Sequence, residues 1–116
     1  MNKSEKLARD WIQGWIAGKP DEIPLSEDFE HTSPFGTIQG REMYLAKVKP
    51  MAAKNVGKLN ILKTIGNKNE AVIWFEMVTP HGVIQVCDWV HTKNEQIVAI
   101  TSFYDATELR NNGQSY

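Results

Sequence analysis

The sequence is poor in residues that form covalent cross-links or bind metal ions. Its 116 residues include one cysteine, Cys87, and three histidines. A single cysteine excludes an internal disulfide and a zinc site made of several thiolates. The histidines His31, His81 and His91 lack the short spacing that is typical of metal ligands. We therefore predict no metal site, and no cofactor, because glycine-rich phosphate-binding motifs are also missing.

The sequence also lacks a large excess of charge and a long hydrophobic run. Its formal net charge is -1 at pH 7, and Lys and Glu are interspersed along the chain. No basic stripe is available to attract phosphates, which argues against a nucleic-acid partner. No apolar run reaches membrane-spanning length, and the charged beginning "MNKSEKLARDW" lacks the apolar centre of a signal peptide. These absences predict a cytoplasmic protein without a membrane partner.

The residues that are present are typical of one globular domain. Hydrophobic residues make up 41% of the chain and charged residues 23%, as in ordinary folded proteins. A chain of this length can bury a single core. We predict one domain over residues 1–116, in which the polar residues 110–116 form a disordered tail.

The first segment predicts an amphipathic helix over residues 3–18. Ser4 is the expected N-cap, and Gly18 followed by Pro20 is expected to end the helix. One face should be buried, because apolar residues recur at helical spacing: Leu7, Ala8, Trp11, Ile12, Trp15 and Ile16.

The next segments predict a strand and a second helix. Residues 20–28 are irregular or form a single short helical turn, because Pro24 interrupts them. Residues 28–33 predict a short strand that ends in a turn at Pro34–Gly36. Residues 41–54 predict a helix with a kink or an end near Pro50.

The remainder of the chain predicts four strands joined by tight turns. Apolar and polar residues alternate in each, over residues 57–66, 71–79, 82–91 and 97–105. Strands joined in this way form an antiparallel meander, and the preceding helices must cover one of its faces. The fold class is therefore α+β.

One carboxylate lies on an apolar strand face. Asp88 alternates in phase with Ile84, Val86 and Val90. A buried unpaired carboxylate costs several kcal/mol, so it must be neutralised, paired or hydrated. It is either a pocket acid with a raised pKa or a structural acid paired with a nearby cation or hydroxyl.

The opposite face of the same sheet carries exposed aromatic residues. Trp89 and His91 alternate in phase with Cys87, and Trp74 points the same way from the preceding strand. Two indoles on one outer face form a sizeable apolar patch, which usually indicates a partner. We predict a homodimer through this face, formed by Trp74, Trp89 and His91.

The order of elements resembles that of a known superfamily. A helix, a strand ending in "SPFG", a helix opening with "GRE", and a meander closing on "FYDATEL" resemble nuclear-transport-factor-2-like proteins over roughly residues 5–109. Within this group the chain is most similar to SnoaL-like and ketosteroid-isomerase-like small proteins. The resemblance implies a strongly curved antiparallel sheet, capped by the N-terminal helices, that forms a cone with an internal pocket, usually in a dimer.

The resemblance transfers unevenly to individual residues. Asp88 falls where the isomerases have an acidic hydrogen-bond donor, but Ser33 stands at the position of their catalytic base. Trp11 stands where they have an oxyanion-binding tyrosine. Steroid isomerisation by that mechanism is therefore not expected. A single late-strand aspartate is similar to the pattern of the polyketide-cyclase branch.

The resemblance also implies which residues line the pocket. His31 shares a strand face with Phe29 and Ser33, and this face would look into the cone together with Asp88. The pair could then act as an acid/base unit, with Asp88 orienting the imidazole; alternatively, His31 is a core histidine bonded to a backbone carbonyl. The other expected ligand-binding residues are Trp11, Trp15, Ser33, Tyr44, Val48, Phe75, Val86, Val90, Ile100, Ser102 and Tyr104.

Two functional hypotheses follow. In the first, the protein binds a small apolar, oxygen-bearing molecule and catalyses a cofactor-free isomerisation, cyclisation or hydrolysis, with Asp88 as acid/base and His31 as its partner. In the second, the same fold is a ligand-binding or dimerisation module without chemistry.

Overall fold

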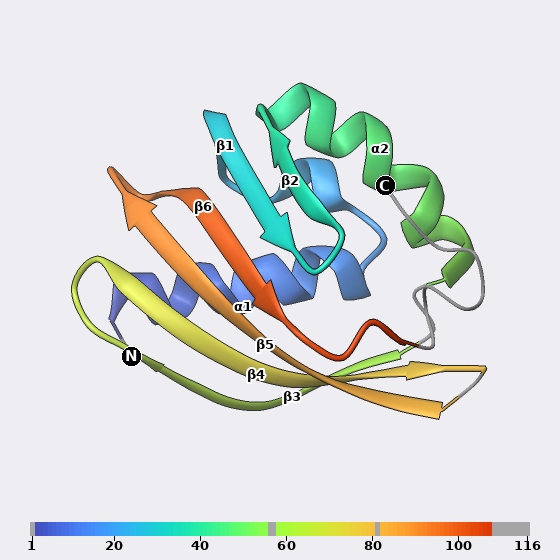
Figure 1. Cartoon of the computed structure of the whole chain (residues 1–116). Helices are drawn as coiled ribbons and strands as arrows, with labels where there is room; N and C mark the ends of the chain where they lie inside the picture. The colour runs from blue at the N-terminus through green and yellow to red at the C-terminus, as the bar shows by residue number, and fades with distance from the viewer. Residues whose placement is uncertain (1, 56–57, 81, 108–116) are drawn as a thin grey trace.

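The computed structural model describes residues 2–55, 58–80 and 82–107, in which two α-helices pack on one face of a single sheet (Figure 1). In chain order, the elements are α1 (Lys3–Ile16), the short 3-10 helix η1 (Pro20–Glu22), β1 (Leu25–Ser33), β2 (Gly36–Gln39), α2 (Arg41–Asn55), β3 (Lys58–Gly66), β4 (Glu70–Thr79), β5 (Gly82–Lys93) and β6 (Gln96–Phe103). Helix α1 packs on β3, β4 and β5, whereas α2 packs on β1 and β2. The α+β class predicted from the sequence is confirmed. The predicted tail at residues 110–116 lies outside the described residues.

The sheet is open and mixed, with strand order β2-β1-β6-β5-β4-β3. The predicted antiparallel meander is present as β3 to β6. The sheet as a whole is not purely antiparallel, because β1 pairs with β6 in parallel. Strand β2, which pairs antiparallel with β1, was not predicted. Alternation within one strand indicates its two faces but not its neighbour, so the parallel pairing was not visible in the sequence.

The long strands bend around α1 (Figure 1). Register shifts interrupt the pairing between Ile61 and Lys63 on β3, and between His91 and Thr92 on β5. An extra residue in one strand of a pair bends that strand and increases its twist. These irregularities therefore contribute to the curvature that gives the sheet a concave face.

The N-cap of helix α1 lies two residues before the predicted one. The side chain of Asn2, not of Ser4, accepts a hydrogen bond from the Glu5 amide, at 2.9 Å. Ser4 is fully buried, and its hydroxyl bonds to the carbonyls of Asn67 and Glu70 in the turn between β3 and β4. Both residue types can cap a helix, so only the packing of α1 on this turn distinguished them.

Helix α2 does not end at Pro50 but continues to Asn55. A proline inside a helix removes one backbone hydrogen bond. Ala46 and Pro50 are both exposed, so water can satisfy the carbonyl that the proline leaves unpaired.

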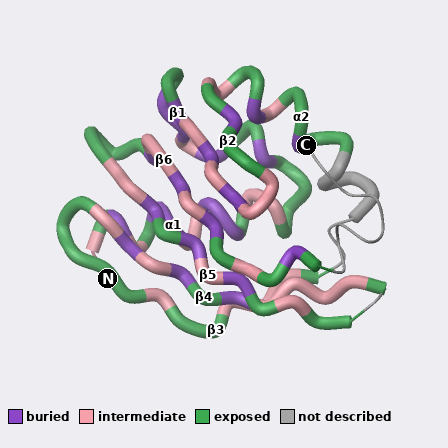
Figure 2. Tube along the Cα trace, viewed as in Figure 1, coloured by how far each residue is buried: buried purple, intermediate pink, exposed green. Residues whose placement is uncertain are grey.

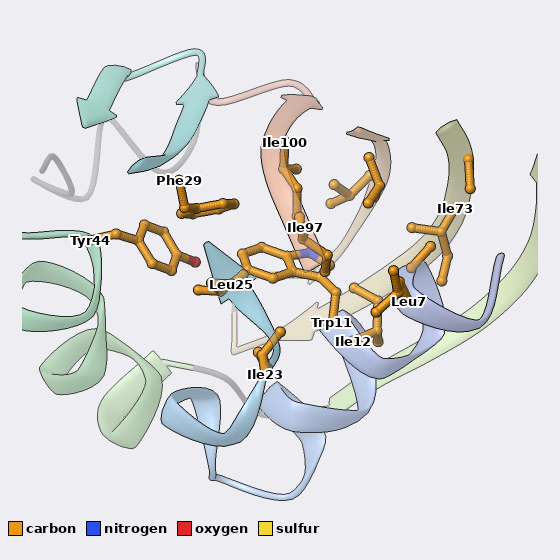
Figure 3. Packing of buried hydrophobic residues seen from close by; sticks show 14 of the residues in the cluster. Leu7, Trp11, Ile12, Ile23, Leu25, Phe29, Tyr44, Ile73, Ile97 and Ile100 are labelled. Atoms are coloured by element: carbon orange, nitrogen blue, oxygen red, sulfur yellow. The ribbon is translucent and has the colours of Figure 1, made fainter. Parts of the chain in front are cut away.

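The core fills the space between the helices and the concave face of the sheet. Buried positions alternate along the central strands, as Figure 2 shows. On β4, Ile73 and Phe75 are buried while Trp74 is exposed, which confirms the predicted faces. The hydrophobic core formed by these buried strand residues also includes Trp11 and Ile12 from α1 (Figure 3).

Candidate functional site

Asp88 lies near the middle of β5 and faces the core. Its neighbours on the same face, Val86 and Val90, are 4% and 0% exposed, and Asp88 itself is 2% exposed. In the ladder it stands between Ile73 on β4 and Ser102 on β6. The sequence prediction of an inward-facing carboxylate is therefore confirmed.

The two oxygens of the Asp88 carboxylate have different environments. The Trp11 indole N–H donates to Oδ2 at 2.9 Å. Oδ1 is buried and has no hydrogen-bond partner among the described residues. Burial raises the pKa of Asp88 to about 6, against the opposing effects of the Ser102 hydroxyl and the Trp11 indole. Such a group can gain or lose a proton near neutral pH.

His31 approaches the carboxylate from the other side of β6. It is buried on β1, and its Nε2 lies 2.8 Å from Ser102 Oγ. The parallel pairing sets His31 opposite Ile100, and Ser102 is two residues farther along the same face of β6. Since Ser102 is also directly opposite Asp88, its hydroxyl lies between the two ionisable groups, and it favours the ionised form of Asp88. Burial lowers the pKa of His31 to about 4.

Aromatic rings from α1, α2 and β1 surround this polar group. The Trp11 ring lies 5.8 Å from the His31 ring and 5.7 Å from the Tyr44 ring, measured between centroids. The Phe29 ring lies 5.1 Å from Tyr44. Figure 3 shows the Trp11 indole at the centre, with Tyr44 and Phe29 pointing toward it. The carboxylate is thus enclosed by apolar walls that strengthen its electrostatic interactions.

The remaining predicted site residues are distributed over the same face. Trp15 is half-buried and packs edge-on at 6.1 Å from Trp11. Ser33 is buried, and its hydroxyl accepts a hydrogen bond from the Phe35 amide. Tyr104 is half-buried, with its ring 6.4 Å from that of Phe35. The aliphatic and aromatic core contains the others, namely Val48, Phe75, Val86, Val90 and Ile100.

The sequence reasoning missed two features of this site. Phe29 contacts both Trp11 and Tyr44, although it was not among the predicted ligand-binding residues. Its position two residues before His31 was the available signal. Ser102 was predicted only as a wall residue, because its position between His31 and Asp88 depends on two strand pairings.

The outer face of the sheet carries the predicted aromatic residues. Trp74 is 42% and Trp89 is 40% exposed, and the Trp89 ring lies 4.5 Å from the His91 ring. Both indole N–H groups donate within the same chain, from Trp74 to Gln85 and from Trp89 to Glu70. Two further exposed apolar side chains lie on this face. Ile65 is in the row of paired residues that contains Trp89, and Phe103 is in the row that contains Trp74.

No cluster of three or more His, Cys, Asp or Glu side chains among the described residues could hold a metal ion. No helix in the described ranges combines the length and the apolar character needed to span a bilayer.

Comparison with solved structures identifies the fold. A protein from Kribbella flavida DSM 17836 superposes with a TM-score of 0.84 and 17% identity, covering 93% of this chain and 91% of its own. A nuclear-transport-factor-2-like protein of unknown function from Cytophaga hutchinsonii superposes with a TM-score of 0.79 and 17% identity. The match covers 92% of this chain and 94% of that protein. A second Kribbella flavida protein, called a candidate ketosteroid isomerase, superposes with a TM-score of 0.74 and 16% identity. The match covers 89% of this chain and 78% of that protein. At these identities the likeness concerns the fold alone.

Comparison of the sequence with protein families gives a second result. No curated protein sequence matches the chain significantly. The SnoaL-like domain matches residues 8–100, which include most of α1, most of the sheet, and His31 and Asp88. The chain has the fold of nuclear-transport-factor-2-like proteins, and it belongs to the SnoaL-like domain family.

Proposed function

We propose that the protein binds a small apolar, oxygen-bearing molecule, with Asp88 as the acid/base that contacts it and His31 as the partner of Asp88. The proposal is carried by the Oδ1 atom of Asp88, which is buried without a hydrogen-bond partner among the described residues. Leaving a buried charged oxygen unsatisfied costs more than a typical hydrogen bond contributes. A ligand group that hydrogen-bonds to Oδ1 would remove this cost.

The surroundings of Asp88 support this ligand chemistry. Trp11, Phe29 and Tyr44 place apolar rings around the site, and the carboxylate provides a polar contact. These rings are at most 3% exposed, so a ligand would reach Asp88 only by moving them apart. When protonated, Asp88 can donate to a carbonyl; when ionised, it can accept from a hydroxyl. Its pKa of about 6 makes both forms accessible near neutral pH, as an acid/base group requires.

The proposed reaction is a cofactor-free isomerisation, cyclisation or hydrolysis that begins with proton transfer. Ser33 and Tyr104 would orient the substrate through their O–H groups, and Trp11, whose N–H is donated to Asp88 Oδ2, would act by holding the carboxylate in place. The steroid-isomerase mechanism is not part of the proposal, because Ser33 and Trp11 replace its base and its tyrosine. A late-strand aspartate acting as acid/base is closer to the polyketide-cyclase pattern.

Binding can be tested with 2-naphthol as an apolar hydroxyl probe. We expect the probe to shift the NMR signal of the Trp11 indole N–H, because this group bonds to the same carboxylate. Asp88→Ala should weaken binding at least tenfold, whereas the exposed Asp105→Asn should have no effect. Unchanged affinity in a folded Asp88→Ala variant would refute the proposed role of Asp88.

Catalysis is tested separately, by following exchange of the α-protons of 1-tetralone in D2O. An exchange rate in the wild type that is higher than in the Asp88→Ala variant would support acid/base chemistry. Binding of 2-naphthol without such exchange would favour the alternative function, a ligand-binding module without chemistry.

We also propose that the outer sheet face forms a homodimer. The indole N–H groups of Trp74 and Trp89 are already bonded within the chain. The exposed ring surfaces of this face can therefore pack against a second copy. Such a two-fold interface is self-complementary. Trp89→Glu should give the monomer mass by light scattering. Met43→Glu, at an exposed apolar residue of α2, should not; a monomeric wild type would refute the interface.

A further inference from the structure

Ser102 lies on the strand between the two ionisable residues, His31 and Asp88. Strand β6 lies between β1 and β5, and Ser102 is buried at 6% exposure. Its Oγ lies 2.8 Å from His31 Nε2, and Asp88 stands directly opposite it in the β5–β6 ladder. Side chains on directly opposed residues have their Cβ atoms about 5 Å apart, which brings a hydroxyl within reach of a carboxylate.

A serine hydroxyl has one hydrogen to donate and two lone pairs that accept. If Ser102 donates to Asp88, it can only accept from His31 Nε2, which must then carry a hydrogen. If Ser102 donates to His31 Nε2, it can only accept from Asp88, which must then be protonated. The direction of this single O–H bond therefore ties the state of one ionisable group to the state of the other.

We propose that Ser102 is a positioning residue that couples the protons of His31 and Asp88, so that the three side chains work as one relay. The inference deepens the proposed function and rests on it for the use of the relayed proton. The coupling itself is a property of the protein without ligand.

The proposed step conserves protons. When His31 is doubly protonated and Asp88 is ionised, the Nε2–H bond breaks and this proton bonds to Ser102 Oγ. The original Ser102 O–H bond breaks in the same step, and its proton bonds to the Asp88 carboxylate. The products are a neutral His31 with its hydrogen on Nδ1 and a neutral Asp88. Burial disfavours charge on both residues, in agreement with the raised pKa of Asp88 and the lowered pKa of His31.

The coupling predicts a tautomer change in His31. With Asp88 protonated, His31 should carry its hydrogen on Nδ1; with Asp88 ionised, it should carry it on Nε2. The other titratable groups beside the relay are Tyr44, whose ring lies 5.3 Å from His31, and Cys87, whose thiol interacts with Asp88. Phenols and thiols are ordinarily neutral below pH 7, so they do not compete in this range.

The test is an NMR titration of the protein between pH 4 and 8. The tautomer is read from the imidazole ¹⁵N shifts of His31, assigned with His31→Gln, and Asp88 ionisation from its carboxyl ¹³C shift. We expect the two transitions to share one midpoint. A His31 tautomer that stays constant while Asp88 titrates would overturn the proposal, and this measurement needs no substitution at Ser102.

Variants separate a relay from simple electrostatic coupling. Ser102→Ala should make the His31 tautomer independent of Asp88, and Ser102→Thr should restore the shared midpoint, because it keeps the hydroxyl. Ser26→Ala, which changes a buried serine of β1 outside the relay, should behave as wild type. Coupling that persists in Ser102→Ala would refute the role of Ser102. Because none of these measurements uses a ligand, failure of the relay and failure of 2-naphthol binding are distinguishable.

Discussion

Asp88 and His31 are buried ionisable residues whose pKa values shift in opposite directions. The pKa of Asp88 rises from 3.8 to about 6, so its contribution to stability is complete below pH 3.8 and is lost as the pH rises through 6. The pKa of His31 falls from 6.5 to about 4, so its contribution is complete above pH 6.5 and is lost as the pH falls through 4. Each shift corresponds to about 3 kcal/mol.

The two effects nearly cancel in the wild type between pH 4 and 6, and substitutions should reveal them. Relative to wild type, Asp88→Asn should gain about 3 kcal/mol of unfolding free energy as the pH rises from 4 to 6.5. His31→Gln should lose a similar amount over the same range. Urea unfolding at half-unit pH steps measures both. Parallel pH profiles for the wild type and Asp88→Asn would contradict the raised pKa.

The hydrogen bond from Trp11 to Asp88 should itself affect titration. Trp11→Phe keeps a ring but removes the N–H that donates to Oδ2. Because this donor favours the ionised carboxylate, its loss should raise the pKa of Asp88 further. A carboxyl ¹³C titration measures the change. Trp15→Phe, one turn along α1, serves as the control and should leave this pKa unchanged.

At the scale of elements, a glycine sets how closely α1 approaches the segment after η1. A Cβ added at Gly14 would lie 2.3 Å from Ile23 Cγ1 and 2.8 Å from Ile23 Cδ1. Replacing glycine by alanine inside a helix normally stabilises it by up to about 1 kcal/mol. Here the buried Ile23 side chain must move, and such overpacking costs roughly 1–3 kcal/mol. The glycine is therefore needed for packing rather than for backbone conformation.

We predict that Gly14→Ala destabilises the protein but becomes neutral or stabilising in an Ile23→Ala background, where the obstructing atoms are missing. Urea unfolding of the four proteins of this cycle gives the coupling energy. Equal effects of Gly14→Ala in the two backgrounds would show that Ile23 is not the obstacle.

The buried Ser4 hydroxyl connects the start of α1 to the sheet, alongside bonds from Asn2 to Gly66 and from Lys3 to Glu95. Ser4 Oγ bonds to Asn2 Oδ1 and to the carbonyls of Asn67 and Glu70. Ser4→Ala would remove the one hydrogen that this buried hydroxyl donates, which should cost about 1–3 kcal/mol; the Glu70 carbonyl and Asn2 Oδ1 keep bonds from the amides of Asn67 and Glu5. The matched variant Ser26→Ala loses one bond to a neighbouring side chain and should cost less. Unfolding free energies in urea compare the two.

At the scale of the whole molecule, the proposed dimer makes stability depend on concentration. If the native state is a dimer, dilution should lower the melting temperature by mass action. The Trp89→Glu variant should melt at a temperature that does not change with dilution. Calorimetry over a hundredfold range of concentration tests both expectations, and a wild type whose melting temperature is equally constant would argue against the dimer.

The sequence alone determined which side chains share a face. The alternation around Asp88, the helical spacing of Leu7, Ala8, Trp11 and Ile12, and the turns between the last four strands are local patterns, because backbone geometry repeats every two or 3.6 residues. These patterns indicated an inward carboxylate, a buried helix face and exposed outer indoles, which the structure contains, except that Ile16 at the end of the predicted helix face is 47% exposed.

Only the tertiary structure decided which faces meet. The parallel pairing of β1 with β6 brings His31 next to Ser102, and the packing of α1 brings the Trp11 indole to Asp88. These groups are more than 70 residues apart in the chain. Their contacts depend on strand order, register and sheet curvature. A periodic pattern specifies the orientation of a side chain relative to its own backbone, but it carries no information about which distant element will pack against it.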